Sequence, residues 1–364
     1  MDKFIKYIFF VFCTVMCINV SAQTTHYPDS SVLCSGKWYC VSISQDGVYK
    51  LSYNDFISMG AEPQEIDFDN ISVFGNTGKA ISETTAEYKY SDLRENAIYV
   101  NKNERYILFY AEATTSHTYN TESGKFSFSL HPYAVSTKYF ITFDKNKGEK
   151  KRILPVTYDQ NKNALEKNYA KDFSFHKREI TNIFEGGRDW VGEKMLPTAP
   201  DIQIPLVLND INISLPSFYD IRLVANSALA SSFSVSVNNS STKTLPVHAT
   251  PVTFTGTDAL LSDSLTINSA NTNVNIHFNY SGQNDRAWLD YILINYSKKL
   301  NFNNRYLRFF STDIIQDNNI KYTVGNVTSR NPMVWDVTDA TQAALIDNVT
   351  TEGNNISFCV QAIQ

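Results

Sequence analysis

The stretch AWLDYILINY, residues 287–296, constrains the fold of this chain more than any other. It contains neither Gly nor Pro and is rich in aromatic and β-branched side chains, which favour a pleated strand. Strict alternation divides its apolar side chains between two faces: Leu289, Tyr291 and Leu293 on one, Trp288, Ile292 and Ile294 on the other. Because both faces are apolar, the stretch predicts a central strand of a packed sandwich rather than an edge strand.

The composition agrees with a folded, strand-rich chain. Its 364 residues are enough for two or three domains, and 43% of them are hydrophobic and 13% aromatic. The net charge of −5 provides no basic field to attract nucleic acid, so we expect no nucleic-acid partner.

The N-terminus has the features of a signal peptide over residues 1–22. Lys3 and Lys6 precede a mostly apolar stretch, residues 7–20, and the sequence VSA then ends at Ala22. The alternative, a single-span membrane anchor, requires a longer apolar run, and no second run follows. We therefore predict cleavage before Gln23 and export to the outer membrane surface or the extracellular space.

Removal of the leader leaves Cys34, Cys40 and Cys359, an odd number that cannot form a complete disulfide framework. Cys34 and Cys40 could pair if a turn brings them together. The other interpretation is that Cys40 is a buried residue of the strand KWYCVSI. The folded chain should depend mainly on its hydrophobic cores for stability.

Residues 23–154 form a predicted N-terminal β-rich domain. Within it, residues 38–43 and 48–51 predict a hairpin, because Asp46-Gly47 supplies the turn. A short helix should follow, with Ser52 and Asp55 as a capping box and Gly60 at its end. Further strands are predicted at residues 71–74, 105–111, 126–130 and 139–143.

The rest of the chain divides into three parts. Residues 155–200 predict a connector with some helix around residues 164–170, because Pro and Gly interrupt a polar stretch. Residues 201–298 contain six regularly spaced strand signals, as in a jelly roll or an immunoglobulin-like sandwich. Residues 299–364 predict further strands and a short helix at 340–346. This last part ends directly after an apolar strand, so we expect the natural product to continue beyond Gln364.

Taken together, these patterns predict an all-β fold. It should comprise two or more antiparallel β-sandwich or jelly-roll-like domains with a few short helices.

No motif in the sequence locates a catalytic, cofactor or metal site. Nucleotide-binding loops and the nucleophile elbow are missing, and the histidines have no paired ligand spacing: His26, His117, His131, His176, His248 and His277. A metal site assembled from distant strands remains an alternative. Cys359 has apolar neighbours and should be a core thiol. Asp290 should be a buried, hydrogen-bonded carboxylate at the rim of the sandwich. We therefore assign no catalytic residue, no metal ligand and no cofactor.

Five stretches, in this order along the chain, resemble the N-terminal, non-catalytic region of the sortases of the Bacteroidetes type IX secretion system, the PorU family. They are residues 31–60, ISVFGNTGKAI with YILFYAEA, GRDWVGE at 187–193, AWLDYILINYSKKL, and NPMVWDVTDAT at 331–341. Val191 departs from the family pattern, which typically has Phe there. Together the five stretches span nearly all of the mature chain.

The resemblance implies a cysteine peptidase and transpeptidase that removes C-terminal sorting signals from cargo and attaches the cargo to the cell surface. In the family, a gingipain-like, caspase-like domain with a His and a Cys follows the VWDVTD region. Only 23 residues follow Thr341 here, so none of the catalytic residues can be carried over. The implied partners are that missing or separate peptidase domain, components of the outer-membrane secretion and attachment complex, and cargo sorting domains.

Three functional hypotheses follow. In the first, the chain is a propeptide-like scaffold that positions or restrains the peptidase. In the second, it is an exported adhesin or carbohydrate-binding protein whose sandwich uses Trp288 and Tyr291; burial of Trp288 would exclude that use. A purely structural exported β-protein is the third interpretation.

Overall fold

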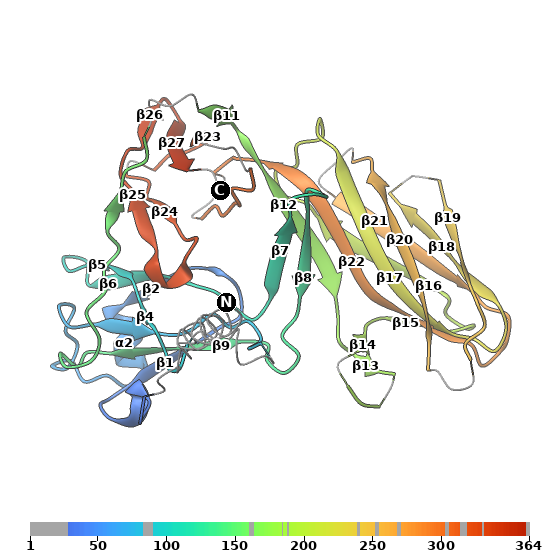
Figure 1. Cartoon of the computed structure of the whole chain (residues 1–364), viewed down its shortest axis with the longest axis horizontal. Helices are drawn as coiled ribbons and strands as arrows, with labels where there is room; N and C mark the ends of the chain where they lie inside the picture. The colour runs from blue at the N-terminus through green and yellow to red at the C-terminus, as the bar shows by residue number, and fades with distance from the viewer. Residues whose placement is uncertain are drawn as a thin grey trace, which may run out of the picture.

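The computed structural model describes residues 28–82, 90–159, 164–183, 185–187, 189–238, 241–251, 255–267, 271–302, 306–313, 319–329 and 331–361. The signal peptide predicted for residues 1–22 lies outside these ranges. Figure 1 shows three β-rich lobes, with one hairpin between the lobe that contains the N-terminal strands and the sandwich. Within the ranges given, no helix has the length and apolar character needed to cross a membrane.

The N-terminal lobe contains two small sheets and the α-helix of the described chain. In chain order its elements are η2 (Val32–Cys34), β1 (Tyr39–Ile43), β2 (Gly47–Ser52), α2 (Tyr53–Ser58), β3 (Ser72–Phe74), β4 (Glu95–Asn96), β5 (Ile98–Asn101), β6 (Tyr106–Ala111), β7 (Ser116–Asn120), β8 (Lys125–Ser129) and β9 (Thr137–Thr142). One sheet has the order β1-β9-β3-β4 and the other β2-β6-β5. Strands β7 and β8 pair only with each other and leave the lobe as a hairpin.

Helix α2 follows the prediction. The Ser52 hydroxyl accepts a hydrogen bond from the Asp55 amide, and the Asp55 carboxylate accepts one from the Ser52 amide. Phe56 is fully buried under the helix, between the rings of Phe68 and Phe143. Gly60 has a φ of 89°, the left-handed conformation that ends a helix. The capping box and the apolar face were both readable from sequence.

The hairpin predicted around Asp46-Gly47 is wrong. Strand β1 pairs with β9, whereas β2 pairs with β6, so the two strands enter different sheets. Longer-range pairing with β9 and β6 overrides the local turn signal, and the Asp46 carboxylate instead accepts a hydrogen bond from the Ala113 amide at 2.8 Å. The turn residues therefore connect strands of two different sheets rather than two strands that pair with each other.

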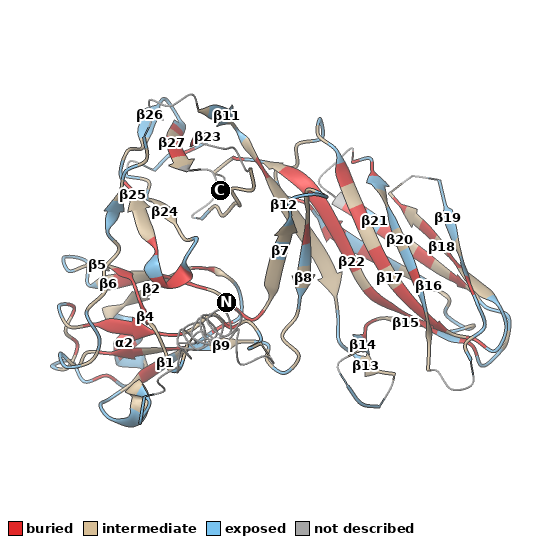
Figure 2. Ribbon diagram, in the orientation of Figure 1, coloured by how far each residue is buried: buried red, intermediate tan, exposed pale blue. Residues whose placement is uncertain are grey.

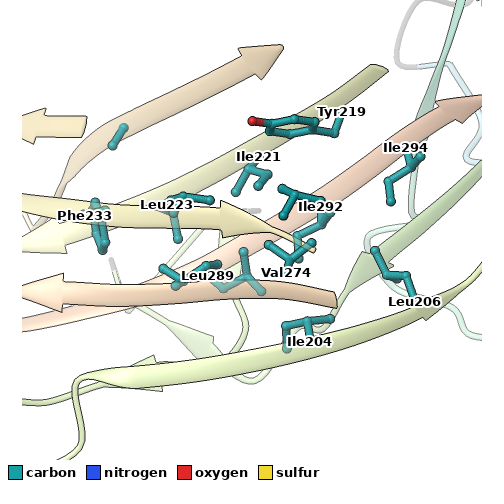
Figure 3. Close-up of a cluster of buried hydrophobic side chains, with 14 of the residues drawn as sticks. Ile204, Leu206, Tyr219, Ile221, Leu223, Phe233, Val274, Leu289, Ile292 and Ile294 are labelled. Atoms are coloured by element: carbon teal, nitrogen blue, oxygen red, sulfur yellow. The ribbon is translucent and has the colours of Figure 1, made fainter. Parts of the chain in front are cut away.

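The middle part of the chain forms a two-sheet sandwich. Its elements are β12 (Tyr169–Lys177), β13 (Thr181–Asn182), β14 (Trp190–Val191), β15 (Lys194–Met195), β16 (Asp201–Val207), β17 (Ser217–Asn226), β18 (Ser231–Val237), β19 (Lys243–Val247), β20 (Thr257–Leu265), β21 (Asn271–Asn279) and β22 (Arg286–Lys299). One sheet has the order β12-β22-β17-β20, with β15 also on β22, and the other β16-β21-β18-β19. The apolar faces of the two sheets meet in one large core (Figures 2 and 3).

Strand β22 confirms the central position predicted for residues 287–296, since it lies between β12 and β17. The predicted division of its side chains between two faces is wrong. Arg222 pairs with Tyr291 and Leu223 with Leu289, so Asp290 is an extra residue in a β-bulge. Leu289 and Ile292 consequently share the inner face, where they join the core (Figure 3).

The C-terminal lobe is discontinuous in sequence. It takes β10 (Pro155–Val156) and β11 (Leu165–Lys167) from before the sandwich. After the sandwich it takes β23 (Asn319–Val324), β24 (Val334–Asp336), η3 (Ala340–Gln342), β25 (Ala344–Ile346), β26 (Thr350–Glu352) and β27 (Asn355–Gln361). Strand β10 pairs with β25 and β11 with β23, both in parallel. The sandwich is therefore inserted between two parts of this lobe.

Two helix predictions in these regions need correction. The helix expected around residues 164–170 is wrong, because β11 and the start of β12 occupy that segment. The helix expected at residues 340–346 is reduced to η3, and β25 takes the remaining residues. In both places, pairing with a distant strand overrides a weak local helical preference. The prediction of an all-β fold with antiparallel sheets and few helices is confirmed.

Candidate functional site

The outer face of the sandwich carries a cluster of charged side chains at the bulge of β22. Asp290 is 3% exposed and accepts hydrogen bonds from Lys177 Nζ and, at 2.8 Å, from an Arg222 guanidinium nitrogen. The other partners of Arg222 are Asp189, at 3.0 and 3.1 Å, and Asp258, at 3.0 and 3.2 Å. We call these five residues the ion cluster.

The ion cluster contains three carboxylates and two cations, and its side chains differ in how far they are exposed. The side chain of Asp258 is 52% exposed, that of Asp189 38% and that of Arg222 20%. The Asp189 carboxylate raises the pKa of Arg222, and Arg222 in turn lowers the pKa of Asp189. Mutual pairing favours the charged forms of Arg222 and Asp189, so this pair is suited to holding strands together rather than to proton transfer.

The loop between β12 and β15 closes over the ion cluster. The Gly192 amide donates to Leu289 O at 2.8 Å, and the Leu289 amide donates to Glu193 O at 2.9 Å. A Cβ on Gly192 would lie 3.0 Å from both Arg178 O and Leu289 O, so a larger residue would push the loop off the sheet. Trp190 O accepts a hydrogen bond from Lys177 Nζ at 3.1 Å.

The ion cluster explains why two of the sequence stretches belong together. GRDWVGE provides Asp189 and the backbone of Gly192, and AWLDYILINY provides Asp290 and Leu289. The prediction that Asp290 is a buried, hydrogen-bonded carboxylate is confirmed. Sequence reasoning missed Arg222 and Lys177, because no local pattern shows which cations face a strand from its neighbours.

A second contact region lies where the β7–β8 hairpin packs on the same outer face of the sandwich. Asn295 Oδ1 accepts a hydrogen bond from the Phe126 amide at 2.6 Å, and Asn295 Nδ2 donates to Phe126 O at 3.1 Å. Phe128 stacks on Phe175 with ring centroids 4.1 Å apart and meets Tyr291 edge-on at 5.7 Å. The hairpin thus joins the N-terminal lobe to the sandwich (Figure 1).

The segment that contains Arg308 and Phe310, from the C-terminal part of the chain, also contacts the β7–β8 hairpin region. Phe310 lies 4.9 Å from Phe126 and 4.7 Å from His117, measured between ring centroids. Arg308 forms an ion pair with Asp46 at 2.7 Å. Burial alone would lower the pKa of Arg308, but Tyr110 and Asp46 outweigh it, and the pKa is raised. We call this region the lobe junction and define it by His117, Phe126, Phe128, Phe173, Phe175, Tyr291, Asn295 and Phe310.

The segment 331–341 makes a separate contact with the N-terminal lobe. The Ala97 amide donates to Thr341 O at 2.9 Å, and Arg94 pairs with Asp339 at 3.4 Å. Trp335 packs in an apolar cluster with Tyr110, which belongs to β6. The VWDVTD region therefore fastens the C-terminal lobe to the N-terminal lobe.

The histidines that the structure describes do not form a common site. His176 Nε2 lies 2.9 Å from Glu193 Oε1. His277 is on the other sheet of the sandwich, where its Nδ1 lies 2.7 Å from Oδ1 of Asp201 on the neighbouring strand. The His277 side chain is half-exposed. His131 closes a turn by accepting from two backbone amides at 3.0 Å, and His248 is exposed. His26 lies outside the described residues.

The cysteines lie in different settings. Cys359 is 2% exposed in β27, and burial raises the pKa of its thiol, so the prediction of a core thiol is confirmed. Cys34 and Cys40 are both exposed and free. The interpretation of Cys40 as a buried strand residue is wrong, because its side chain lies on the outer face of β1.

Trp288 and Tyr291 do not form a sugar-binding platform. Trp288 is 3% exposed and packs in an apolar cluster with Val191 and Val224. Tyr291 is covered edge-on by Phe128. Stacking on a sugar requires an open aromatic face, which the burial of Trp288 excludes for that residue. In the part of the chain that the structure describes, no group of three His, Cys, Asp or Glu side chains is placed to hold a metal ion.

Comparison with solved structures identifies an extended match. The crystal structure of dimeric latent PorU from Porphyromonas gingivalis superposes with a TM-score of 0.75 and 20% sequence identity. The match covers 92% of this chain and 31% of that chain. The chain thus has a PorU-like fold and spans less than a third of the length of that protein.

Carbohydrate-binding modules match far less well. The CBM36-1 domain of a multidomain xylanase from the hindgut metagenome of Trinervitermes trinervoides gives a TM-score of 0.24 at 9% identity, covering 34% of this chain and 96% of that chain. A score this low does not indicate a shared fold. No protein-family model matches the sequence, and the search of curated proteins finds no match.

Proposed function

We propose that this chain is the non-catalytic, propeptide-like scaffold region of a type IX secretion sortase. The observation that supports this proposal most strongly is the PorU-like fold, which extends over 92% of the chain. In this proposal the full-length protein cleaves C-terminal sorting signals and attaches cargo at the cell surface. The peptidase chemistry resides in a further domain.

The contacts between the lobes support a scaffold role. The lobe junction fastens the sandwich to the N-terminal lobe, and segment 331–341 fastens the C-terminal lobe to it. The inserted sandwich is tied to the C-terminal lobe by the chain on both sides. Such an arrangement keeps a neighbouring domain at one orientation, which is what positioning or restraining a peptidase requires.

Export and partners complete the proposal. The predicted leader would direct the chain out of the cytoplasm, and the scaffold would then act at the outer membrane surface. Its partners would be the peptidase domain, components of the secretion and attachment complex, and cargo sorting domains. The solved PorU is described as latent and dimeric. We infer that this region contributes to restraint of the peptidase in the present protein too.

The decisive experiment begins with the gene. We expect the reading frame to continue past the codon for Gln364 into a caspase-like domain that contains a His and a Cys. In the source bacterium, removal of the codons for residues 28–361 should leave cargo with uncleaved C-terminal signals, detected by mass spectrometry of exported proteins. A reading frame that ends at Gln364, together with normally processed cargo in the deletion strain, would refute the proposal.

A further inference from the structure

We propose that the lobe junction is a pH-sensitive latch, in which protonation of His117 releases the β7–β8 hairpin from the sandwich. The latch is a property of the described lobes and does not depend on the proposed sortase function. It would let the N-terminal lobe and the sandwich separate in an acidic environment and close again at neutral pH.

The geometry places the His117 imidazole among aromatic rings from three parts of the chain. Its ring centroid lies 6.2 Å from that of Phe126 on β8, 5.7 Å from that of Phe173 on β12, and 4.7 Å from that of Phe310. Among the described residues, none forms a hydrogen bond with its ring nitrogens. The imidazole is half-buried and packs against these rings, and a proton on it would have no acceptor within the cluster.

The charges around His117 also disfavour protonation. Burial lowers the pKa of His117 most, and the cations Arg308 and Lys79 lower it further. Asp46 opposes them, but its carboxylate already pairs with Arg308 at 2.7 Å. Lys79 pairs with Glu112 at 3.0 Å. A protonated His117 would add a third cation to a region with two cations and two engaged carboxylates.

The strands packed against His117 offer no compensating charge. On β8, Lys125 lies over the Phe218 ring at 4.6 Å from its centroid. On β12, Lys171 is a further cation, and Asp172 pairs with Lys298 at 3.4 Å. Asp46, Glu112 and Asp172 are thus each already paired with a lysine or an arginine.

The direction of the pH effect follows from linkage. A histidine with a lowered pKa in the packed state binds protons more readily when the junction is open. The free energy that holds the junction closed is fully present above about pH 6.5, the ordinary pKa of a histidine. It is lost as the pH falls through the lowered pKa of His117. Carboxylates with ordinary values near 4 remain ionised in the upper part of that window.

Opening has a defined structural result. The hairpin is held on the sandwich by the Asn295 amide and by the stacking of Phe128 on Phe175. Because β7 and β8 pair only with each other, the hairpin can leave without breaking any sheet of the lobes. The latch can therefore open while the individual lobes stay folded.

The test is small-angle X-ray scattering of the mature chain, residues 23–364, at about pH 7.5 and about pH 5 with constant ionic strength. We expect the radius of gyration to rise at the lower pH while far-ultraviolet circular dichroism stays unchanged. His117→Phe, which keeps an aromatic ring but cannot be protonated, should abolish the rise. The matched control His277→Gln, at a half-exposed histidine on the other sheet, should keep it.

Two results would overturn the latch. One is a rise in the radius of gyration of His117→Phe equal to that of the unmodified chain. The other is a histidine NMR titration, assigned by comparison with His117→Gln, in which the midpoint of His117 is at or above about 6.5. If His117→Phe does not fold, His117→Gln serves as the non-protonating variant in the scattering experiment.

Discussion

The Asn295 side chain pairs with the backbone of Phe126 through two hydrogen bonds, as an adjacent strand would, although 169 positions separate the two residues. The amide oxygen accepts from the Phe126 N–H and the amide nitrogen donates to the Phe126 C=O. Both residues are buried at this contact. The Asn295 side chain thus satisfies both backbone polar groups of Phe126, whose hairpin packs on the sheet that contains Asn295.

Replacing Asn295 with alanine should loosen the hairpin. Two buried backbone groups would lose their partners, at a cost of about 1–3 kcal/mol each before relaxation. We expect trypsin to cleave after Lys125, near the hairpin turn, faster than in the unmodified chain. Asn273→Ala, at an exposed position of β21, is the control and should leave the rate unchanged. Equal cleavage rates in both variants would argue against the role of Asn295.

Removing the Asp290 carboxylate should destabilise the sandwich strongly. Asp290→Ala leaves Arg222 and Lys177 without their shared buried partner, and loss of one member of a buried pair costs about 3–5 kcal/mol. Asp258→Ala removes a half-exposed partner of the same Arg222 and should cost about 1 kcal/mol or less. Urea unfolding followed by tryptophan fluorescence compares the two. Similar midpoints would show that burial does not govern the ion cluster.

Gly75→Ala should disturb the N-terminal lobe. The added Cβ would lie 2.4 Å from a ring carbon of Tyr139, which is 1% exposed and held through its hydroxyl by the Glu112 amide at 3.1 Å. Overpacking of this kind costs about 1–3 kcal/mol. At Gly47 the nearest atoms to such a Cβ are 3.8 Å away, so Gly47→Ala should be nearly neutral. Thermal unfolding of both variants tests the difference.

Thiol titration should separate the three cysteines of the mature chain. Cys34 is exposed, and hydrogen bonds from Ser30 and Ser35, with help from Lys147, lower its pKa, so it should react readily with a disulfide reagent at neutral pH. Cys40 is exposed and should also react. Cys359 is buried with a raised pKa and should react only after denaturation. Fast labelling of Cys359 in the native chain would contradict its position in the core.

The sequence predicts where helices and strands form better than it predicts which strands pair. Helix α2 follows from Ser52 and Asp55, because a capping box acts within one turn. The strand at residues 38–43 forms, but its predicted hairpin does not, since turn residues cannot show that β9 lies beside it. The bulge at Asp290 was likewise unreadable, because one extra residue is visible only against the partner strand.

The candidate site was predictable only in part. Asp290 stands out as one acid in an apolar strand, so its burial and pairing could be inferred. Arg222 and Lys177 lie in strands where polar and apolar residues alternate in the usual way. Nothing near them in sequence indicates that both pair with the Asp290 carboxylate. The lobe junction was not foreseen at all. Phe126 and Phe173 look like core residues of their own strands, and only the tertiary structure places them together.

The order of strands within the sandwich has a consequence for how the chain folds. Strand β12 is the first strand of its sheet to leave the ribosome, yet its partner β22 is the last, and more than a hundred residues separate them. During synthesis and export, the β12 backbone must wait without its β22 partner. Slow closure of this kind invites aggregation. A chaperone that shields β12 until β22 emerges would therefore raise the yield of folded protein.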